Sequence, residues 1–155
     1  MRKVAVGIVM CVMLAACQQA DETSQSVDGP QEKPSSPSEA VHQNDVINMH
    51  GEISNLNRFE TFIANVKADK SDHIRVISYT TEGDPIFYLL DFDGKQIEYT
   101  FDNSQDGYAG SDKGQKSTTC KDITENATTN GTEYALAGCS SKVGDTFYFR
   151  IESKG

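Results

Sequence analysis

The stretch IFYLLDFDGKQIEYTF at residues 86–101 decides the fold of this chain. Two runs rich in aromatic and β-branched residues flank Asp93-Gly94, and this dipeptide is the strongest short-range signal for a β-hairpin, because both turn residues need a positive φ. A two-residue turn fixes the register of residues 86–92 against residues 95–101. One face then carries only apolar pairs, which are Leu90–Ile97, Tyr88–Tyr99 and Ile86–Phe101. The other face is mixed and carries Phe87 and Leu89 among polar residues.

An amphipathic helix precedes the hairpin. Its apolar residues follow the spacing i, i+3, i+4 and i+7, which places them on one helical stripe: Phe59, Phe62, Ile63 and Val66. Asn57 is the expected N-cap, and Glu60 stands at the third helical position, as in a capping box. We expect this stripe to pack on a sheet.

Further strands are expected on both sides of the hairpin. Residues 73–79 are β-branched and end in the turn Glu82-Gly83-Asp84-Pro85. Residues 118–127 and 132–139 form another expected pair, in register with Ile123 opposite Leu136, although residues 118–127 also fit a helix. Residues 146–151 complete the set. The sequence therefore predicts an α+β fold, with one amphipathic helix packed on an antiparallel sheet of about five strands.

The N-terminus has the pattern of a secretion signal. Arg2 and Lys3 precede an uncharged segment at residues 4–16, which is too short to cross a bilayer as a helix of roughly 20 residues. Leu14-Ala15-Ala16-Cys17 resembles the lipobox of bacterial lipoproteins. We expect residues 1–16 to be a signal peptide and Cys17 to carry lipid, which tethers the protein to the extracytoplasmic face of the cell membrane. The alternatives are an ordinary signal peptide with a chance cysteine, or an uncleaved anchor.

Residues 17–43 form the expected lipidated and disordered tether. The segment holds three of the four prolines and no aromatic residue, so it cannot bury enough apolar surface to offset its ordering entropy. Residues 44–155 are then a single globular domain. Removal of the signal peptide takes the net charge from −9 to −11, because two basic residues and no acid are lost. Such an acidic chain predicts no nucleic-acid partner.

The cysteines predict one disulfide. Cys11 lies in the signal peptide and Cys17 is the lipidation site, which leaves Cys120 and Cys139 in a chain expected to reach an oxidising space. The register of residues 118–139 places these two opposite each other. A redox or metal-binding pair is the alternative, but the spacing is not Cys-x-x-Cys.

Two groups of polar residues are candidate sites. The first is the run at residues 102–107, where Asp102 and Asp106 stand as in the opening of a calcium loop, although Lys113 occupies the position of the closing acid. A polar loop after a strand is the favoured reading. No pattern predicts a cofactor, a metal centre or a catalytic nucleophile, and the three histidines lack metal-ligand spacing.

The second group lies around the strand at residues 73–79. Its members are Arg75, Tyr79, Glu82 and Asp84. They form a candidate binding rim in which Arg75 clamps a carboxylate or a phosphate. The favoured interpretation is a solvated turn with a weak Arg75–Glu82 ion pair.

Several segments together resemble the domain-of-unknown-function family DUF4362. They are residues 74–86 with Tyr79-Thr80-Thr81-Glu82-Gly83-Asp84-Pro85-Ile86, His50-Gly51-Glu52-Ile53, Asp93-Gly94-Lys95, residues 102–106 and the ending Tyr134…Gly138-Cys139. The resemblance covers about residues 44–151. It implies a lipoprotein of Gram-positive, spore-forming bacteria and no particular activity.

The sequence favours a non-catalytic module at the cell envelope. Its expected partners are the membrane, through the lipid anchor, and an envelope protein, peptide or small ligand on the mixed sheet face. One alternative is an extracytoplasmic hydrolase or metal-dependent enzyme that uses Glu82, Asp84 or Asp102. Another is a purely structural envelope protein.

Overall fold

The computed structural model describes residue 42 and residues 44–153. The expected signal peptide, Cys17 and nearly all of the tether lie outside the described residues. Among the residues that are described, no helix is long and apolar enough to span a membrane.

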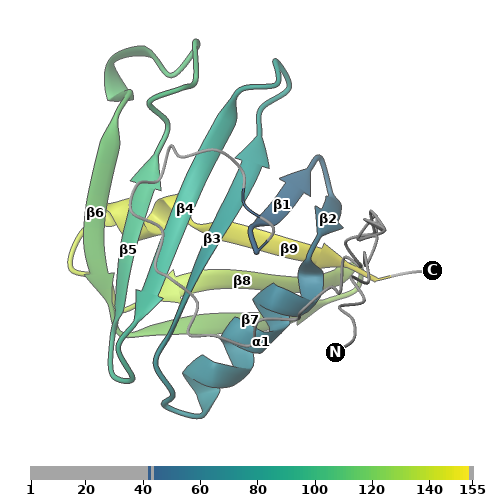
Figure 1. Ribbon diagram of the computed structural model, residues 1–155, viewed down its shortest axis with the longest axis vertical. Helices are drawn as coiled ribbons and strands as arrows, with labels where there is room; N and C mark the ends of the chain where they lie inside the picture. Colours follow the sequence, from purple (N-terminus) through teal and green to yellow (C-terminus); the bar gives the residue numbers. More distant parts are fainter. Residues whose placement is uncertain (1–41, 43, 154–155) are drawn as a thin grey trace, which may run out of the picture. The chain divides into compact units, whose positions relative to one another are not determined.

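A six-stranded sheet forms one layer (Figure 1). Its spatial order is β2-β1-β3-β4-β5-β6, and only the pair β1 and β3 is parallel. The strands are β1 (Val46–Met49), β2 (Glu52–Ser54), β3 (Asp72–Tyr79), β4 (Pro85–Phe92), β5 (Ile97–Asp102) and β6 (Gln115–Cys120).

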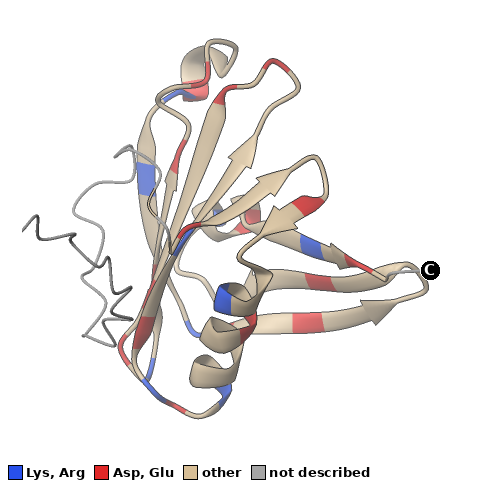
Figure 2. Cartoon of the chain, turned by 45° about the vertical axis from the view of Figure 1, so that its right-hand side comes forward, with Lys and Arg blue, Asp and Glu red and all other residues tan. Residues whose placement is uncertain are grey.

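A second sheet of three antiparallel strands and one helix cover the same face of the first sheet (Figure 2). The second sheet has the order β7-β8-β9, and its strands cross those of the first sheet steeply (Figure 1). The elements are α1 (Leu56–Lys67), β7 (Asp122–Thr128), β8 (Gly131–Ala137) and β9 (Tyr148–Glu152), with short 3-10 helices η1 (Gly110–Asp112) and η2 (Lys142–Thr146).

The core lies between these layers. All four residues of the expected helical stripe are buried in it, together with side chains of both sheets. Phe59 is fully buried, and its ring centroid lies 5.0 Å from that of Tyr134 and 4.2 Å from that of Phe149. Tyr134 lies in β8 and Phe149 in β9, so this aromatic contact group packs the helix on the second sheet, worth several kcal/mol of apolar burial by order of magnitude.

The α+β class is confirmed, but the expectation of one antiparallel sheet of about five strands is wrong. Residues 118–127 are not one strand, because the chain changes sheets at Lys121. Cys120 pairs with Ile97 in the first sheet, whereas Asp122 pairs with Ala137 in the second. The helical alternative for this segment is also wrong, and the expected pairing of Ile123 with Leu136 is confirmed.

The hairpin of β4 and β5 is confirmed, but its register is shifted by two residues. Phe92 pairs with Ile97, and Leu90 pairs with Tyr99. The carboxylate of Asp93 accepts hydrogen bonds from the backbone N–H groups of Gln96 (2.9 Å) and Lys95 (2.8 Å), which widens the turn to four residues. These bonds also lower the pKa of Asp93. A shift of two keeps every side chain on its expected face.

The start of the helix differs from the expectation. The N-cap is Asn55 rather than Asn57, so the capping box with Glu60 is not formed. Asn55 has a left-handed φ of 56°, and its side-chain amide donates to the backbone carbonyl of Asp45 instead of capping the helix. A contact outside the helix thus decides where it begins.

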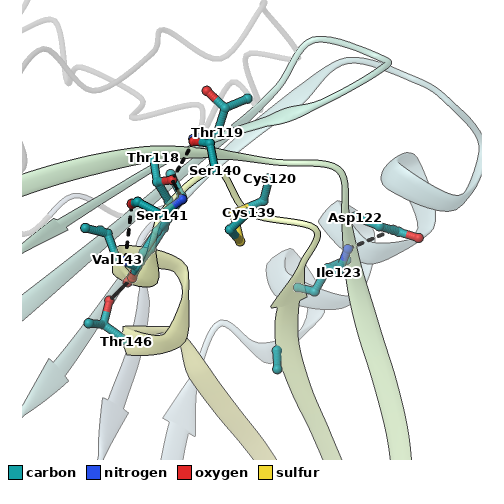
Figure 3. Close-up of a disulfide and its surroundings, with 12 residues drawn as sticks. Thr118, Thr119, Cys120, Asp122, Ile123, Cys139, Ser140, Ser141, Val143 and Thr146 are labelled. Carbon is teal, nitrogen blue, oxygen red and sulfur yellow. Dashed lines mark hydrogen bonds between the residues drawn. A yellow bond between two sulfur atoms is a disulfide. The ribbon is translucent and has the colours of Figure 1, made fainter.

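The Cys120–Cys139 disulfide is present. It joins the end of β6 to the segment that follows β8, so it links the two sheets (Figure 3). The neighbouring hydroxyl groups of Thr118 and Ser140 lie 3.0 Å apart in a hydrogen bond. Gly144 packs against the disulfide, because a Cβ atom there would lie 2.2 Å from Sγ of Cys139.

Candidate ligand-binding site

The structure does not bring the four residues of the expected binding rim together. Arg75 is buried, and its partner is Asp45 rather than Glu82. Tyr79 is half-buried at the end of β3, roughly 13 Å along the strand from Arg75, and Glu82 is exposed in the following turn. Asp84 accepts a hydrogen bond from the N–H of Gly107 at 2.8 Å. Asp84 thus ties this turn to the β5–β6 loop.

The acids of the expected calcium loop bind their own backbone. Asp102 is buried and accepts a hydrogen bond from the N–H of Ser104 (2.7 Å), and Asp106 accepts one from the N–H of Tyr108 (2.7 Å). In the part of the chain that the structure describes, no three His, Cys, Asp or Glu side chains are grouped to hold a metal ion. These bonds shape the loop.

The mixed face of the sheet offers less apolar surface than its sequence indicated. Phe87 is only 3% exposed, and Leu89 is half-buried. The guanidinium of Arg75 lies 5.9 Å from the centre of the Phe87 ring, within the range of a cation–π contact. Little of Phe87 is therefore free to meet a partner.

A cleft of about 590 Å³ opens elsewhere, between the C-terminal end of α1, the β4–β5 turn and strand β7. We call it the α1–β7 cleft. Its apolar floor is small and is formed by Val66 (7% exposed), Phe92 (3% exposed) and the half-buried Ile123. Val66 and Phe92 belong to the core, and Ile123 packs against it. The floor is consequently a small exposed margin of the hydrophobic core.

Six charged side chains surround this floor and form the charged rim of the cleft. They are Lys67, Asp69, Lys95, Lys121, Asp122 and Glu125. They come from five places in the fold: the end of α1, the α1–β3 loop, the β4–β5 turn, the corner between β6 and β7, and strand β7 itself. In Figure 2, blue and red segments occur together along the turns at this end of the first sheet.

Backbone contacts hold two sides of the rim in place. Gly94, with φ of 95°, packs against the α1–β3 loop, because a Cβ atom there would lie 3.1 Å from the carbonyl oxygen of Asp69. On the other side, the pairing of Ile97 with Cys120 brings Lys121 beside the turn that carries Lys95. The rim is therefore set by the strand register.

One ion pair closes part of the rim. Nζ of Lys67 lies 2.5 Å from Oε2 of Glu125, across the gap between α1 and β7. This hydrogen bond raises the pKa of Lys67. Both side chains are well exposed, at 63% and 39%, so water screens the pair.

The other two lysines of the rim have no carboxylate within 4.0 Å among the described residues. They are Lys95 and Lys121, while salt bridges occupy Lys67 and Lys116. The stem of Lys121 lies over Gly138, where a Cβ atom would come within 3.1 Å of its Cβ and Cγ. An exposed ammonium group without a carboxylate partner among the described residues is suited to bind an anionic group.

The model of the domain of unknown function DUF4362 matches residues 43–135. The chain belongs to the DUF4362 family. The matched region includes the whole α1–β7 cleft and ends within β8. No curated protein and no solved structure gives a significant match.

Sequence reasoning did not single out any residue of the charged rim. The three lysines lie 28 and 26 positions apart along the chain, and no motif connects them. Only the change of sheet at Lys121 brings β7 next to α1, and that change carries no local sequence signal. The residues of the site come together through the topology of the strands and not through a local sequence motif.

Proposed function

We propose that this DUF4362 protein is a lipoprotein of a Gram-positive cell envelope, anchored through Cys17 on the extracytoplasmic face of the membrane. We further propose that it is a non-catalytic binding module for a small ligand. The observation that carries the binding role is the α1–β7 cleft, with its apolar floor and charged rim. Small-molecule sites are concave, and their polar groups fix the orientation of the ligand; this cleft is lined mostly by charged groups, which favours a polar ligand.

Two features support the anchoring and the compartment. The lipobox-like Leu14-Ala15-Ala16-Cys17 places a cysteine where lipid is attached, and a diacylglyceryl group holds a protein to a membrane without a spanning helix. The Cys120–Cys139 disulfide joins the two sheets. Structural disulfides form and persist in oxidising compartments, which favours a location outside the cytoplasm.

Palmitate labelling with cell fractionation tests the anchor. Cells producing the wild-type chain, Cys17→Ser or Cys11→Ser are fed an alkyne analogue of palmitate. Cys11→Ser is the matched control, because residue 11 would leave with the signal peptide. We expect label in the wild-type and Cys11→Ser proteins and none in Cys17→Ser. Equal labelling of all three would refute lipidation at residue 17.

Blocking the cleft tests the binding role. Ala127 lines the cleft and is exposed, so Ala127→Trp fills its mouth with little effect on the core. The intact, isotope-labelled protein in detergent is mixed with the small-molecule fraction of the host envelope. We expect amide shifts at Val66 and Ile123 in the wild type and none in Ala127→Trp. Shifts confined to other surfaces, or no shifts, would exclude the cleft as the ligand site.

A further inference from the structure

The charged rim of the α1–β7 cleft has equal numbers of positive and negative groups. Three lysines face three carboxylates, in a chain whose net charge is −9. The Lys67–Glu125 pair neutralises itself. Two lysines and two aspartates remain to interact with a ligand: Lys95, Lys121, Asp69 and Asp122.

The two aspartates are placed differently. One carboxylate oxygen of Asp122 accepts a hydrogen bond from the N–H of Ile123 at 2.7 Å, which fixes the orientation of the group. Asp69 stands at a left-handed position, φ 52°, where the α1–β3 loop meets the β4–β5 turn. The carboxylate of Asp122 is thus oriented by a backbone N–H group, and the backbone of Asp69 is placed at the rim by the loop.

This arrangement selects against ligands of a single charge sign. A simple anion drawn to Lys95 and Lys121 also meets the two aspartates, and a simple cation drawn to the aspartates meets the two lysines. Like-charge contacts oppose each of them. A molecule that carries both a carboxylate and an ammonium group satisfies both sets, and an apolar side chain between them would cover Val66, Phe92 and Ile123.

We infer that the α1–β7 cleft takes a zwitterionic ligand of the amino-acid or short-peptide class. Its carboxylate meets Lys95 and Lys121, its ammonium group meets Asp69 and Asp122, and its apolar side chain covers the floor. The cleft volume of about 590 Å³ admits a short peptide. This inference rests on the proposed role of the cleft as the ligand site.

The test uses leucyl-leucine and two blocked forms of it. The N-acetyl form keeps only the carboxylate, and the C-terminal amide keeps only the ammonium group. Each is titrated into the intact, isotope-labelled protein in detergent, and the amide shifts of the cleft residues give the affinity. We expect each blocked form to bind about tenfold more weakly, as loss of a hydrogen-bonded charged contact costs roughly that factor.

Lysine variants assign the carboxylate. Lys95→Met and Lys121→Met keep the aliphatic stems, and Lys142→Met on η2, outside the cleft, is the control. We expect the two rim variants to bind leucyl-leucine and its N-acetyl form about tenfold more weakly, and to bind the amide form at least as tightly as the wild type, because a like charge is removed. Lys142→Met should bind like the wild type.

The results that would overturn the inference are distinguishable from those that would overturn the proposed function. If the cleft binds only one blocked form, or all three forms equally well, the ligand class is wrong while the cleft remains the proposed binding site. If none of the three peptides shifts the cleft residues, the inference is wrong. If the envelope fraction also leaves the cleft unshifted, the proposed function fails with it.

Discussion

Arg75 binds Asp45 in a buried, two-pronged ion pair. Its Nε donates to Oδ1 at 3.0 Å, its Nη2 donates to Oδ2 at 2.6 Å, and the two side chains are 0% and 4% exposed. Asp45 directly precedes β1, and Arg75 lies in β3, the parallel neighbour of β1. The pair therefore fixes the N-terminal end of the described domain to the centre of the first sheet.

Breaking this pair is expected to destabilise the fold strongly. Arg75→Met leaves the carboxylate of Asp45 buried without its cation, and such losses cost about 3–5 kcal/mol in the free energy of unfolding. Lys116→Met, which removes an exposed pair with Asp112, should cost about 0–1 kcal/mol. Urea denaturation followed by circular dichroism measures both. Similar values for the two variants would show that the buried pair does not stabilise the domain.

Removing the disulfide is expected to lower stability moderately. Cys120 and Cys139 are separated by 19 positions, and closing a loop of this size contributes about 3 kcal/mol in the chain-entropy model. The double variant Cys120→Ala/Cys139→Ala should therefore unfold at lower urea concentration. A reducing agent should bring the wild type to the same midpoint and leave the double variant unchanged. A wild-type midpoint that does not respond to full reduction would contradict this.

Gly144 is expected to be intolerant of a side chain. Gly144→Ala places a methyl group against Sγ of Cys139, so either the disulfide or η2 must move, at a cost of about 1–3 kcal/mol. Gly107→Ala is the control, because its Cβ would lie 3.4 Å from the flexible carboxylate of Asp84. Thermal unfolding compares them. The account of this contact is wrong if Gly144→Ala melts together with Gly107→Ala and the wild type.

Asp72 is expected to make the free energy of unfolding depend on pH in the acidic range. Burial alone would raise its pKa, but hydrogen bonds from Asn65 (2.8 Å) and Arg58 (2.7 and 3.1 Å) outweigh burial and lower it from 3.8. In the window between the folded and unfolded pKa, the unfolded chain binds the extra proton, so stability rises with pH there. The contribution of the Asp72 carboxylate to the free energy of unfolding is complete above pH 3.8. It is lost as the pH falls through the pKa that Asp72 has in the folded protein.

The variant Asp72→Asn isolates this effect. Urea midpoints of the wild type and of Asp72→Asn are compared from pH 7 down to the acid transition. The stability difference between the two proteins should shrink as the pH falls below 3.8. A difference that stays constant through this range would exclude Asp72 as a source of the pH dependence.

Local sequence signals predicted the helices and strands of this fold better than they predicted which elements and residues contact one another. The helical stripe of α1 and the hairpin of β4 and β5 follow from spacing and turn residues. The pairing of β7 with β8 was also expected from them, although a helix over residues 118–127 was the alternative. The hairpin register was missed because one side chain, Asp93, binds two backbone N–H groups and lengthens the turn. The helix start was missed because Asn55 bonds to Asp45.

The division into two sheets and the cleft were not predictable in this way. Nothing in the sequence around Lys121 marks a change of sheet, since strand propensity continues through it. The ion-pair partner of Arg75 is Asp45, 30 positions away, which local patterns cannot identify. The sequence instead offered the nearby Glu82 as a partner. The charged rim depends on the change of sheet, because that change brings β7 next to α1.

The lipid on Cys17 is tested most directly by mass spectrometry of the protein purified from the membranes of its host. The account predicts that the N-terminal peptide starts at Cys17 and carries the mass of a diacylglyceryl group, with or without a further acyl chain. A peptide that retains Met1, or one that begins at an unmodified residue, would contradict the anchor and the compartment that depends on it.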